Sequence, residues 1–169
     1  MLIGKDNNTT IRVMFGGLVF CLAAAVSTAT AALADGTSAL RRGGSPTAGR
    51  QLIALAERGD TRAQTRLGFM YEYGRGVPQD FVIAAHWYRC AAEQGEPSAQ
   101  YQLGLMYDKG HGVPRSAVIA YTWLNLAAAR ARPPERDYYL RIRDAVASKL
   151  NSAQRAEAQG LASSWVPQR

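Results

Sequence analysis

Apolar residues recur from Ala63 onward with the period of an α-helix. They stand at i, i+4, i+7 and i+8, on one stripe of an amphipathic helix, and are Ala63, Leu67, Met70 and Tyr71. Gly74 and the run Gly76-Val77-Pro78 follow this stripe. Glycine accepts the left-handed backbone at a helix end and proline cannot continue a helix, so the pattern predicts a helix that stops at this turn.

A second apolar stripe follows the turn and predicts a second helix. Its members stand at i, i+3, i+4, i+7 and i+8, and are Ala84, Trp87, Tyr88, Ala91 and Ala92. Asp80 precedes this stripe and can cap the helix start. Gly68 lies inside the first helix, where glycine costs about 1 kcal/mol against alanine. Its recurrence at Gly104 predicts that two antiparallel helices approach closely there.

The chain repeats itself. Residues 59–94 align with residues 95–130 without a gap, and 17 of the 36 aligned positions are identical. The identical positions include Leu67-Gly68 with Leu103-Gly104 and Trp87 with Trp123. A repeat of this length predicts a stack of helix pairs in which each unit packs against its neighbours.

Shorter segments flank the two units. Residues 50–58 match the end of the second helix of a unit, so we interpret them as an N-terminal half-repeat that caps the stack. Residues 131–169 are expected to form two closing helices, and Asn151 with Gln154 supplies a capping box for the last one. Ser116 occupies the helix-start position that Asp80 has in the first unit.

The unit Ala-x3-Leu-Gly-x-Met-Tyr-x2-Gly-x-Gly-Val-Pro, followed by Ala-x2-Trp and Ala-Ala, resembles the Sel1-like repeat, a relative of the tetratricopeptide repeat. The resemblance covers residues 59–130 as two full units. It implies an all-α fold, an α/α superhelix (solenoid) of antiparallel helix pairs with about two full repeats plus caps. It also implies an adaptor or scaffold that binds other proteins, although the fold does not fix the partner.

The N-terminal segment has the layout of a secretory signal. Lys5 and Arg12 precede an uncharged stretch from residue 13 to residue 33, and Ala32-Leu33-Ala34 offers small residues at a cleavage site. We expect residues 1–34 to be a signal peptide cut after Ala34, which places the protein in the periplasm or outside the cell. The alternative is an uncleaved inner-membrane anchor, with the chain facing the periplasm and touching the membrane only there. Residues 35–49 are expected to be a flexible linker.

The net charge of the chain indicates which classes of partner it can bind. Loss of residues 1–34 leaves a net charge of +6 in an exported protein. This favours acidic protein surfaces, anionic glycans or an anionic membrane face over nucleic acid, the alternative being an ordinary solvated surface. Cleavage also removes Cys21 and leaves no second cysteine for an intramolecular disulfide. Cys90 aligns with Leu126, so we expect its thiol to act as a small core hydrophobe.

We find no catalytic residue, metal site or cofactor motif in the sequence. The chain has two histidines, His86 and His111, which are too far apart in sequence for an ordinary metal cluster. Glu72 and Asp108 share one repeat position, which is typical of a solvent-facing helix end rather than a hydrolytic pair. The aromatic residues at repeated positions are expected to be core rather than a sugar-binding strip: Tyr71, Tyr107, Trp87, Trp123 and, outside the repeat, Trp165.

Differences between the two units indicate where function lies. On the first helix of the first unit, a second stripe consists of Arg62, Arg66, Phe69 and Tyr73; its counterparts in the second unit are Ser98, Gln102, Leu105 and Lys109. Packing would keep repeat positions alike, so this stripe is either solvent-facing or a ligand surface. If the first helices line the inner groove of a solenoid, the stripe suits an acidic peptide. The candidate protein-binding residues are Arg62, Arg66, Phe69, Tyr73, Gln102, Leu105 and Lys109.

The leading functional hypothesis is an exported, non-enzymatic adaptor that binds a protein or peptide segment in this groove. A second hypothesis is a cell-envelope enzyme or a factor associated with peptidoglycan or polysaccharide. A third is a structural role in which the basic C-terminal helices pack against another copy of the chain. The sequence does not fix the oligomeric state.

Overall fold

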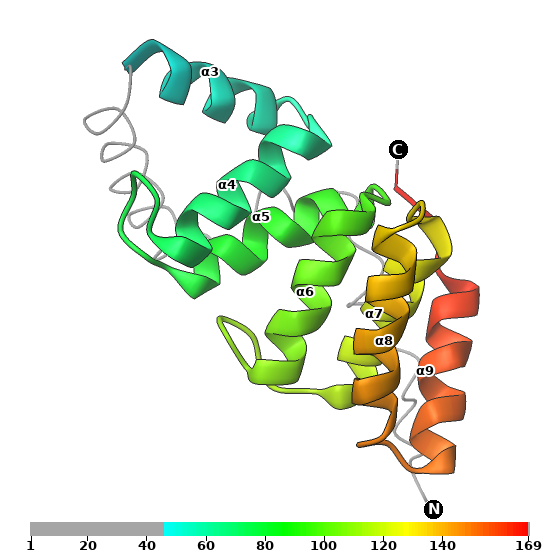
Figure 1. The fold of residues 1–169 in the computed structure, drawn as a ribbon. Coiled ribbons are helices and arrows are strands. Elements are labelled where there is room, and N and C mark those ends of the chain that lie inside the picture. The colour runs from blue at the N-terminus through cyan, green and yellow to red at the C-terminus, as the bar shows by residue number, and fades with distance from the viewer. Residues whose placement is uncertain (1–45, 169) are drawn as a thin grey trace, which may run out of the picture.

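The computed structural model describes residues 46–168. Seven α-helices lie in this range (Figure 1): α3 (Pro46–Glu57), α4 (Thr61–Tyr73), α5 (Phe81–Glu93), α6 (Pro97–Lys109), α7 (Ala117–Arg130), α8 (Glu135–Ala147) and α9 (Ser152–Ser164). Helices α4 with α5 and α6 with α7 are the two predicted pairs, and α5 packs on α6 to join them. The all-α solenoid is therefore confirmed. Helix α3 begins at Pro46, four residues before the expected start of the folded part near Arg50.

The helix ends follow from local chemistry. Asp80 caps α5 by accepting from the backbone N–H groups of Val82 and Ile83. Ser116 caps α7, and Asn151 with Gln154 forms the predicted capping box of α9. Gly74 and Gly110 end α4 and α6 with φ of 64° and 76°, a left-handed conformation that disfavours any residue with a Cβ. The repeated sequence signals thus set the repeated boundaries.

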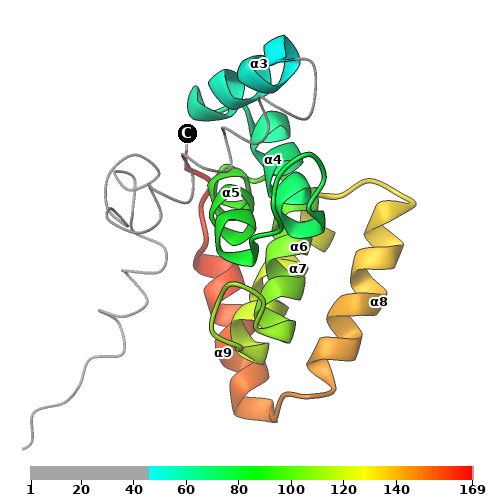
Figure 2. The same ribbon diagram turned by 90° about the vertical axis from the view of Figure 1, so that its left-hand side faces the viewer.

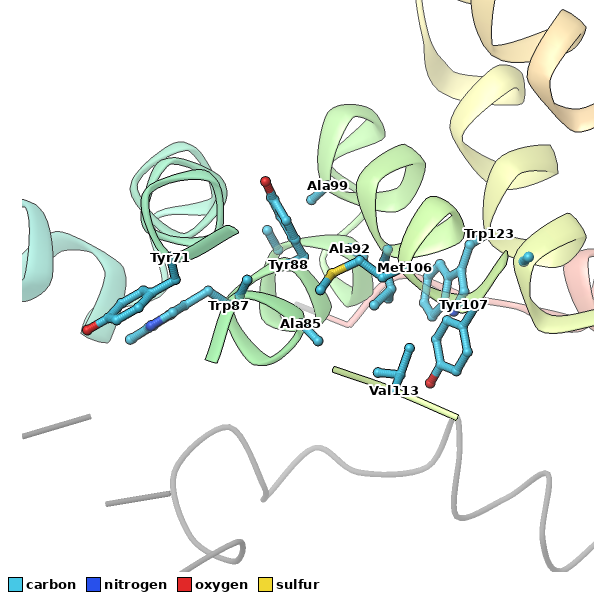
Figure 3. Packing of buried hydrophobic residues seen from close by; sticks show 14 of the residues in the cluster. Tyr71, Ala85, Trp87, Tyr88, Ala92, Ala99, Met106, Tyr107, Val113 and Trp123 are labelled. Atoms are coloured by element: carbon cyan, nitrogen blue, oxygen red, sulfur yellow. The ribbon is translucent and has the colours of Figure 1, made fainter. Parts of the chain in front are cut away.

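The core is built from the predicted stripes (Figure 3). Tyr71, Tyr107, Trp87 and Trp123 are all buried, which confirms their structural role. Alanines fill much of α5 and α7, so the helices can approach closely. A Cβ at Gly68 would lie 2.7 Å from the ring of Tyr88, and this ring therefore fits directly against the backbone of α4.

Helix α7 is buried on nearly all sides because three helices pack on it. Apolar residues occur on all sides of α7, as expected for a helix without a solvent-facing side. Figure 2 shows α8 on one side of α7 and α9 on the other. The two expected C-terminal helices thus close the stack, yet they do so by enclosing α7 rather than as another repeat-like pair. The hydroxyl of Thr122 donates to the carbonyl of Ala158 at 3.3 Å, across the α7–α9 contact.

The segment after α9 returns along the stack. The ring of Trp165 meets that of Trp123 edge to face, with centroids 6.3 Å apart, and the guanidinium of Arg130 lies 4.5 Å from the Trp165 ring. The backbone N–H of Gln168 then donates to the carbonyl of Glu93 at 2.9 Å. The C-terminal residues therefore contact both α7 and the last residue of α5.

Cys90 corrects one expectation. Its side chain is buried, as predicted, but it is disulfide-bonded. The expectation of a free thiol that acts as a small core hydrophobe is therefore wrong at this position. The predicted signal peptide and most of the predicted linker lie outside the described residues. Within residues 46–168, no helix is long and apolar enough to cross a membrane.

Candidate functional site

A cavity of about 400 Å³ opens between α4 and α6. We call this cavity and its rim the α4–α6 groove. Its lining residues come from α4, α5 and the first half of α6: Arg62, Thr65, Arg66, Phe69, Tyr88, Glu96, Ser98 and Gln102. The structure therefore brings four of the predicted site residues together in one cavity, namely Arg62, Arg66, Phe69 and Gln102.

The α4 wall of the groove carries two exposed cations. Arg62 and Arg66 stand one helical turn apart, on the same face of α4. In the described part of the chain, neither guanidinium forms an ion pair or a hydrogen bond. Phe69 continues the wall as a half-buried ring, one turn further along. This side of the groove therefore offers positive charge beside an apolar surface.

Tyr88 supplies the apolar floor from α5. Its ring is fully buried against Gly68, and its hydroxyl donates to a carboxylate oxygen of Glu72 at 2.7 Å. Burial, followed by the hydrogen bond and charge of Glu72, raises the pKa of the Tyr88 phenol well above its usual range. The phenol is therefore neutral throughout the physiological pH range, and the floor carries no charge of its own.

The α6 wall begins with an acid that does not cap its helix. Asp60, at the same repeat position before α4, accepts from the backbone N–H of Ala63 at 2.8 Å. Glu96 forms no such bond and instead accepts from the hydroxyl of Ser98 at 3.0 Å. Glu96 lines the same cavity as the two arginines but comes from the residue before α6. The groove is thus basic on α4, apolar at its floor and acidic where α6 begins.

Three predicted site residues lie outside the cavity lining. Tyr73 is 52% exposed, and its ring centroid lies 4.6 Å from that of Phe69, so it continues the α4 wall beyond the cavity. The pKa of Tyr73 is raised, mainly by burial and then by Glu72. A hydrogen bond with Gln102 lowers it by less than these two effects raise it. Leu105 is half-buried, and Lys109 is exposed at the end of α6.

Four lining residues were not among the predicted site residues: Thr65, Tyr88, Glu96 and Ser98, of which Ser98 was noted only as the counterpart of Arg62. Tyr88 was assigned to the core stripe, and it is indeed a core residue with one edge at the cavity. Thr65 aligns with Tyr101 of the second unit, so the difference between the two units at this position was a usable signal. Glu96 aligns with Asp60, and only the structure shows that Asp60 caps its helix whereas Glu96 does not.

The groove offers charged and apolar side chains rather than a cluster of metal ligands. No group of three metal-ligating side chains that could hold an ion occurs among residues 46–168. Burial, followed by the charge of Arg89, lowers the pKa of His86, but this residue does not line the cavity. The groove combines unpaired cations with apolar surface, which suits an anionic ligand that also carries an apolar group.

Comparison with known proteins identifies the fold family. A sequence model described as the Sel1 repeat matches residues 61–96 and 97–131. These bounds lie within two residues of the units found by internal alignment. The crystal structure of a Sel1 repeat protein from Oxalobacter formigenes is 43% identical, with a TM-score of 0.50, over 54% of this chain and 68% of that one. This chain belongs to the Sel1 repeat family.

A longer relative shares the same fold. The crystal structure of a protective antigen present in uropathogenic Escherichia coli strains, which displays an SLR fold, is 34% identical with a TM-score of 0.63. The similarity covers 68% of this chain and 24% of the antigen, so this Sel1 repeat protein spans about a quarter of that relative. None of the curated proteins compared with the sequence matches it. Sel1 repeats generally mediate protein interactions and are typically non-catalytic.

Proposed function

We propose that this Sel1 repeat protein is an exported, non-enzymatic adaptor that binds an acidic peptide or protein segment in the α4–α6 groove. The observation that carries the proposal is the pair Arg62 and Arg66. Both guanidiniums lack partners in the described chain and stand at the rim of a cavity with an apolar floor. Two such cations one helical turn apart can bind one carboxylate together or two neighbouring ones.

The size and lining of the groove support a segment rather than a whole domain as ligand. A cavity of about 400 Å³ holds a few side chains, and the half-buried ring of Phe69 and the exposed ring of Tyr73 extend the contact along α4. Aromatic and arginine side chains are the types that contribute most to binding energy at protein interfaces. The cavity lining contains no histidine or cysteine, which favours an adaptor over the alternative of an envelope enzyme.

Export is part of the same proposal. Residues 1–34 carry the signal-peptide pattern, with Ala34 as the last residue removed, and the protein would then act in the periplasm or outside the cell. N-terminal sequencing of the protein from a periplasmic fraction checks this. A chain that begins at Asp35 supports cleavage, whereas an intact N-terminus in the membrane fraction indicates an anchor instead.

The test of the adaptor is affinity capture from an envelope extract with residues 35–169, followed by identification of the bound protein and direct titration with its acidic segments. The variant Arg66→Glu with Tyr73→Ala changes the groove at two exposed positions. Arg132→Glu is the matched control, since it makes the same charge change in the exposed turn between α7 and α8. Circular dichroism confirms that each variant is folded.

A partner that is lost only with the groove variant supports the proposal. Equal capture by all three proteins would place the binding surface elsewhere. Capture of no protein, together with sedimentation of the chain with peptidoglycan, would favour the polysaccharide alternative. A mass that rises with protein concentration in light scattering would favour the structural one.

A further inference from the structure

The acid before α6 differs from its counterparts in the repeat. Glu96 aligns with Asp60 in the first unit, where the side chain caps α4, and with Arg132 after the second unit. Glu96 itself forms no cap bond, and the residues that cap well have shorter side chains. Pro97 follows at the start of α6 and has no N–H group that needs a partner. Capping of α6 therefore does not explain the glutamate at this position.

The Glu96 carboxylate lies at the cavity of the α4–α6 groove and keeps free acceptor capacity. It accepts from the hydroxyl of Ser98 at 3.0 Å, and both residues line the cavity. Within residues 46–168, Glu96 forms no ion pair. Burial, followed by the charges of Glu135 and Glu96, raises the pKa of Tyr139, so the charge of Glu96 acts on its surroundings. A carboxylate has about four acceptor sites, and most of those on Glu96 are open to a ligand donor.

The cavity therefore contains charges of both signs that are not paired with each other. Arg62, Arg66 and Glu96 all line it, and none of the three forms an ion pair in the described part of the chain. Charges in a partly enclosed cavity interact more strongly with a ligand than charges in open water do. A ligand with acidic groups alone would be repelled by Glu96, whereas one that also carries a cation can be attracted by all three residues.

The apolar part of the lining suits the stem of a basic side chain. The rings of Phe69 and Tyr88 line the cavity, and the Tyr88 hydroxyl already donates to Glu72 at 2.7 Å. Lysine carries four methylene groups before its ammonium, and such stems pack along apolar surface while the charged end stays at a polar group. A lysine can thus cover the rings and place its ammonium at the Glu96 carboxylate.

We propose that Glu96 is a specificity-determining residue of the groove, and that the bound acidic segment also carries a basic residue whose cation pairs with Glu96. The proposal rests on the proposed function, because the carboxylates that bind Arg62 and Arg66 place the segment. All three charged side chains line one cavity of about 400 Å³, so the basic residue is expected within two residues of the acidic ones. The ligand is thus a segment of mixed charge rather than a uniformly acidic one.

The experiment measures binding of synthetic peptides to the full chain by isothermal titration calorimetry. The first peptide carries two glutamates and, two residues further, a lysine. The second has norleucine in place of the lysine, which keeps the stem and removes the charge. The third has glutamines in place of the glutamates, and the fourth has a glutamate in place of the lysine. All four have the same length and acetylated and amidated ends, so that no terminal charge contributes.

The first peptide is expected to bind about threefold to tenfold more tightly than the second, since one ion pair is lost, and the fourth is expected to bind more weakly still. Glu96→Gln should lower affinity for the first peptide to that of the second, leave the second within about twofold, and raise affinity for the fourth. Glu157→Gln is the matched control, because it removes the same charge at an exposed position on α9. It should leave all four affinities unchanged.

Glu96→Asp separates specificity from folding. The shorter side chain is expected to cap α6 as Asp60 caps α4, which should raise the midpoint of thermal unfolding. A carboxylate that bonds to the helix backbone is withdrawn from the cavity, so affinity for the first peptide should fall although the protein is more stable. A variant that is more stable and binds the first peptide as tightly as the wild type would contradict the role of Glu96.

The two proposals fail in different ways. If the first and second peptides bind equally to the wild type, and Arg66→Gln weakens both, Glu96 does not select the ligand while the acidic groove stands. Equal weakening of both peptides by Glu96→Gln would likewise show a structural role only. If the first and third peptides bind equally, the arginines are not the anion site and the proposed function fails in this form. If none of the four binds, both proposals are overturned.

Discussion

The side-chain amide of Gln100 on α6 donates a hydrogen bond of 3.0 Å to the backbone carbonyl of Ala92 on α5. The same bond occurs one unit earlier, where the amide of Gln64 donates to the carbonyl of Ala56 at 3.0 Å. Both glutamines are buried, and each joins the first turn of one helix to the end of the preceding one. The repeat is thus held in register by a polar contact as well as by its apolar stripes.

The side-chain oxygens of the two glutamines have different contacts. Substituting the two residues should therefore lower the free energy of unfolding by different amounts. The Gln64 oxygen accepts from the amide of Gln94 at 2.9 Å, whereas the buried oxygen of Gln100 has no partner. Position 130, which aligns with Gln94, is an arginine whose guanidinium lies over Trp165. Gln100→Met is expected to change the free energy of unfolding by less than about 1 kcal/mol, and Gln64→Met to lower it by about 1.5 to 3 kcal/mol. Urea unfolding measures both, and a larger loss for Gln100→Met contradicts the account.

Alanine substitutions at two helical glycines are expected to have opposite effects. A Cβ at Gly104 would lie 2.8 Å from Leu124 and 3.2 Å from the backbone carbonyl of Ala120, whereas a Cβ at Gly160 in α9 meets no atom within 4 Å. Gly104→Ala is therefore expected to cost about 1 to 3 kcal/mol despite the better helix propensity of alanine. Gly160→Ala is expected to gain up to about 1 kcal/mol. Thermal melts of the two variants should move in opposite directions from the wild type.

Binding in the groove is expected to weaken with salt. Arg62 and Arg66 are exposed, and at an ionic strength of about 0.15 M charges are screened over a distance of about 8 Å. The dissociation constant for an acidic peptide should rise as salt is added, and Arg66→Gln should reduce the slope of this dependence. Titrations at several salt concentrations measure it. An affinity that does not change with salt would exclude a carboxylate contact at these residues.

Buried phenols predict a loss of stability at high pH. Burial, followed by the charge of Asp80, raises the pKa of Tyr71 from its ordinary value of 10.0 to about 12. In the unfolded chain this phenol loses its proton first, so above pH 10 the unfolded state is favoured increasingly until the folded phenol also ionises near pH 12. This contribution to stability is complete below pH 10 and is lost between the two values. Tyr71→Phe should reduce the decrease in stability between these pH values. Denaturant midpoints measured across the same pH range test this prediction.

The sequence predicted the repeat, its helix boundaries and its core because each has a local signal. The alignment of two units identified the glycines that approach a neighbouring helix, and the capping residues Asp80, Ser116 and Asn151 were visible one by one. The positions of α8 and α9 had no such signal. Their amphipathic patterns predicted helices, but that both pack on α7 depends on surfaces formed only after the stack assembles.

The sequence predicted only part of the candidate site, because only some of its residues have a local signal. Comparing the units separated packing positions from variable ones and so identified Arg62, Arg66, Phe69 and Gln102 on the groove. Tyr88 was missed because one side chain serves both core and cavity, a dual role that a periodic pattern does not show.

Helix α4 uses opposite faces for two purposes, with Leu67 and Tyr71 buried while Arg62 and Arg66 are exposed. The exposed set can therefore change without disturbing the buried one. A new ligand preference could be installed by exchanging a few side chains on this face, with little effect on folding. For a protein engineer, the groove is an independently adjustable part of an otherwise fixed scaffold.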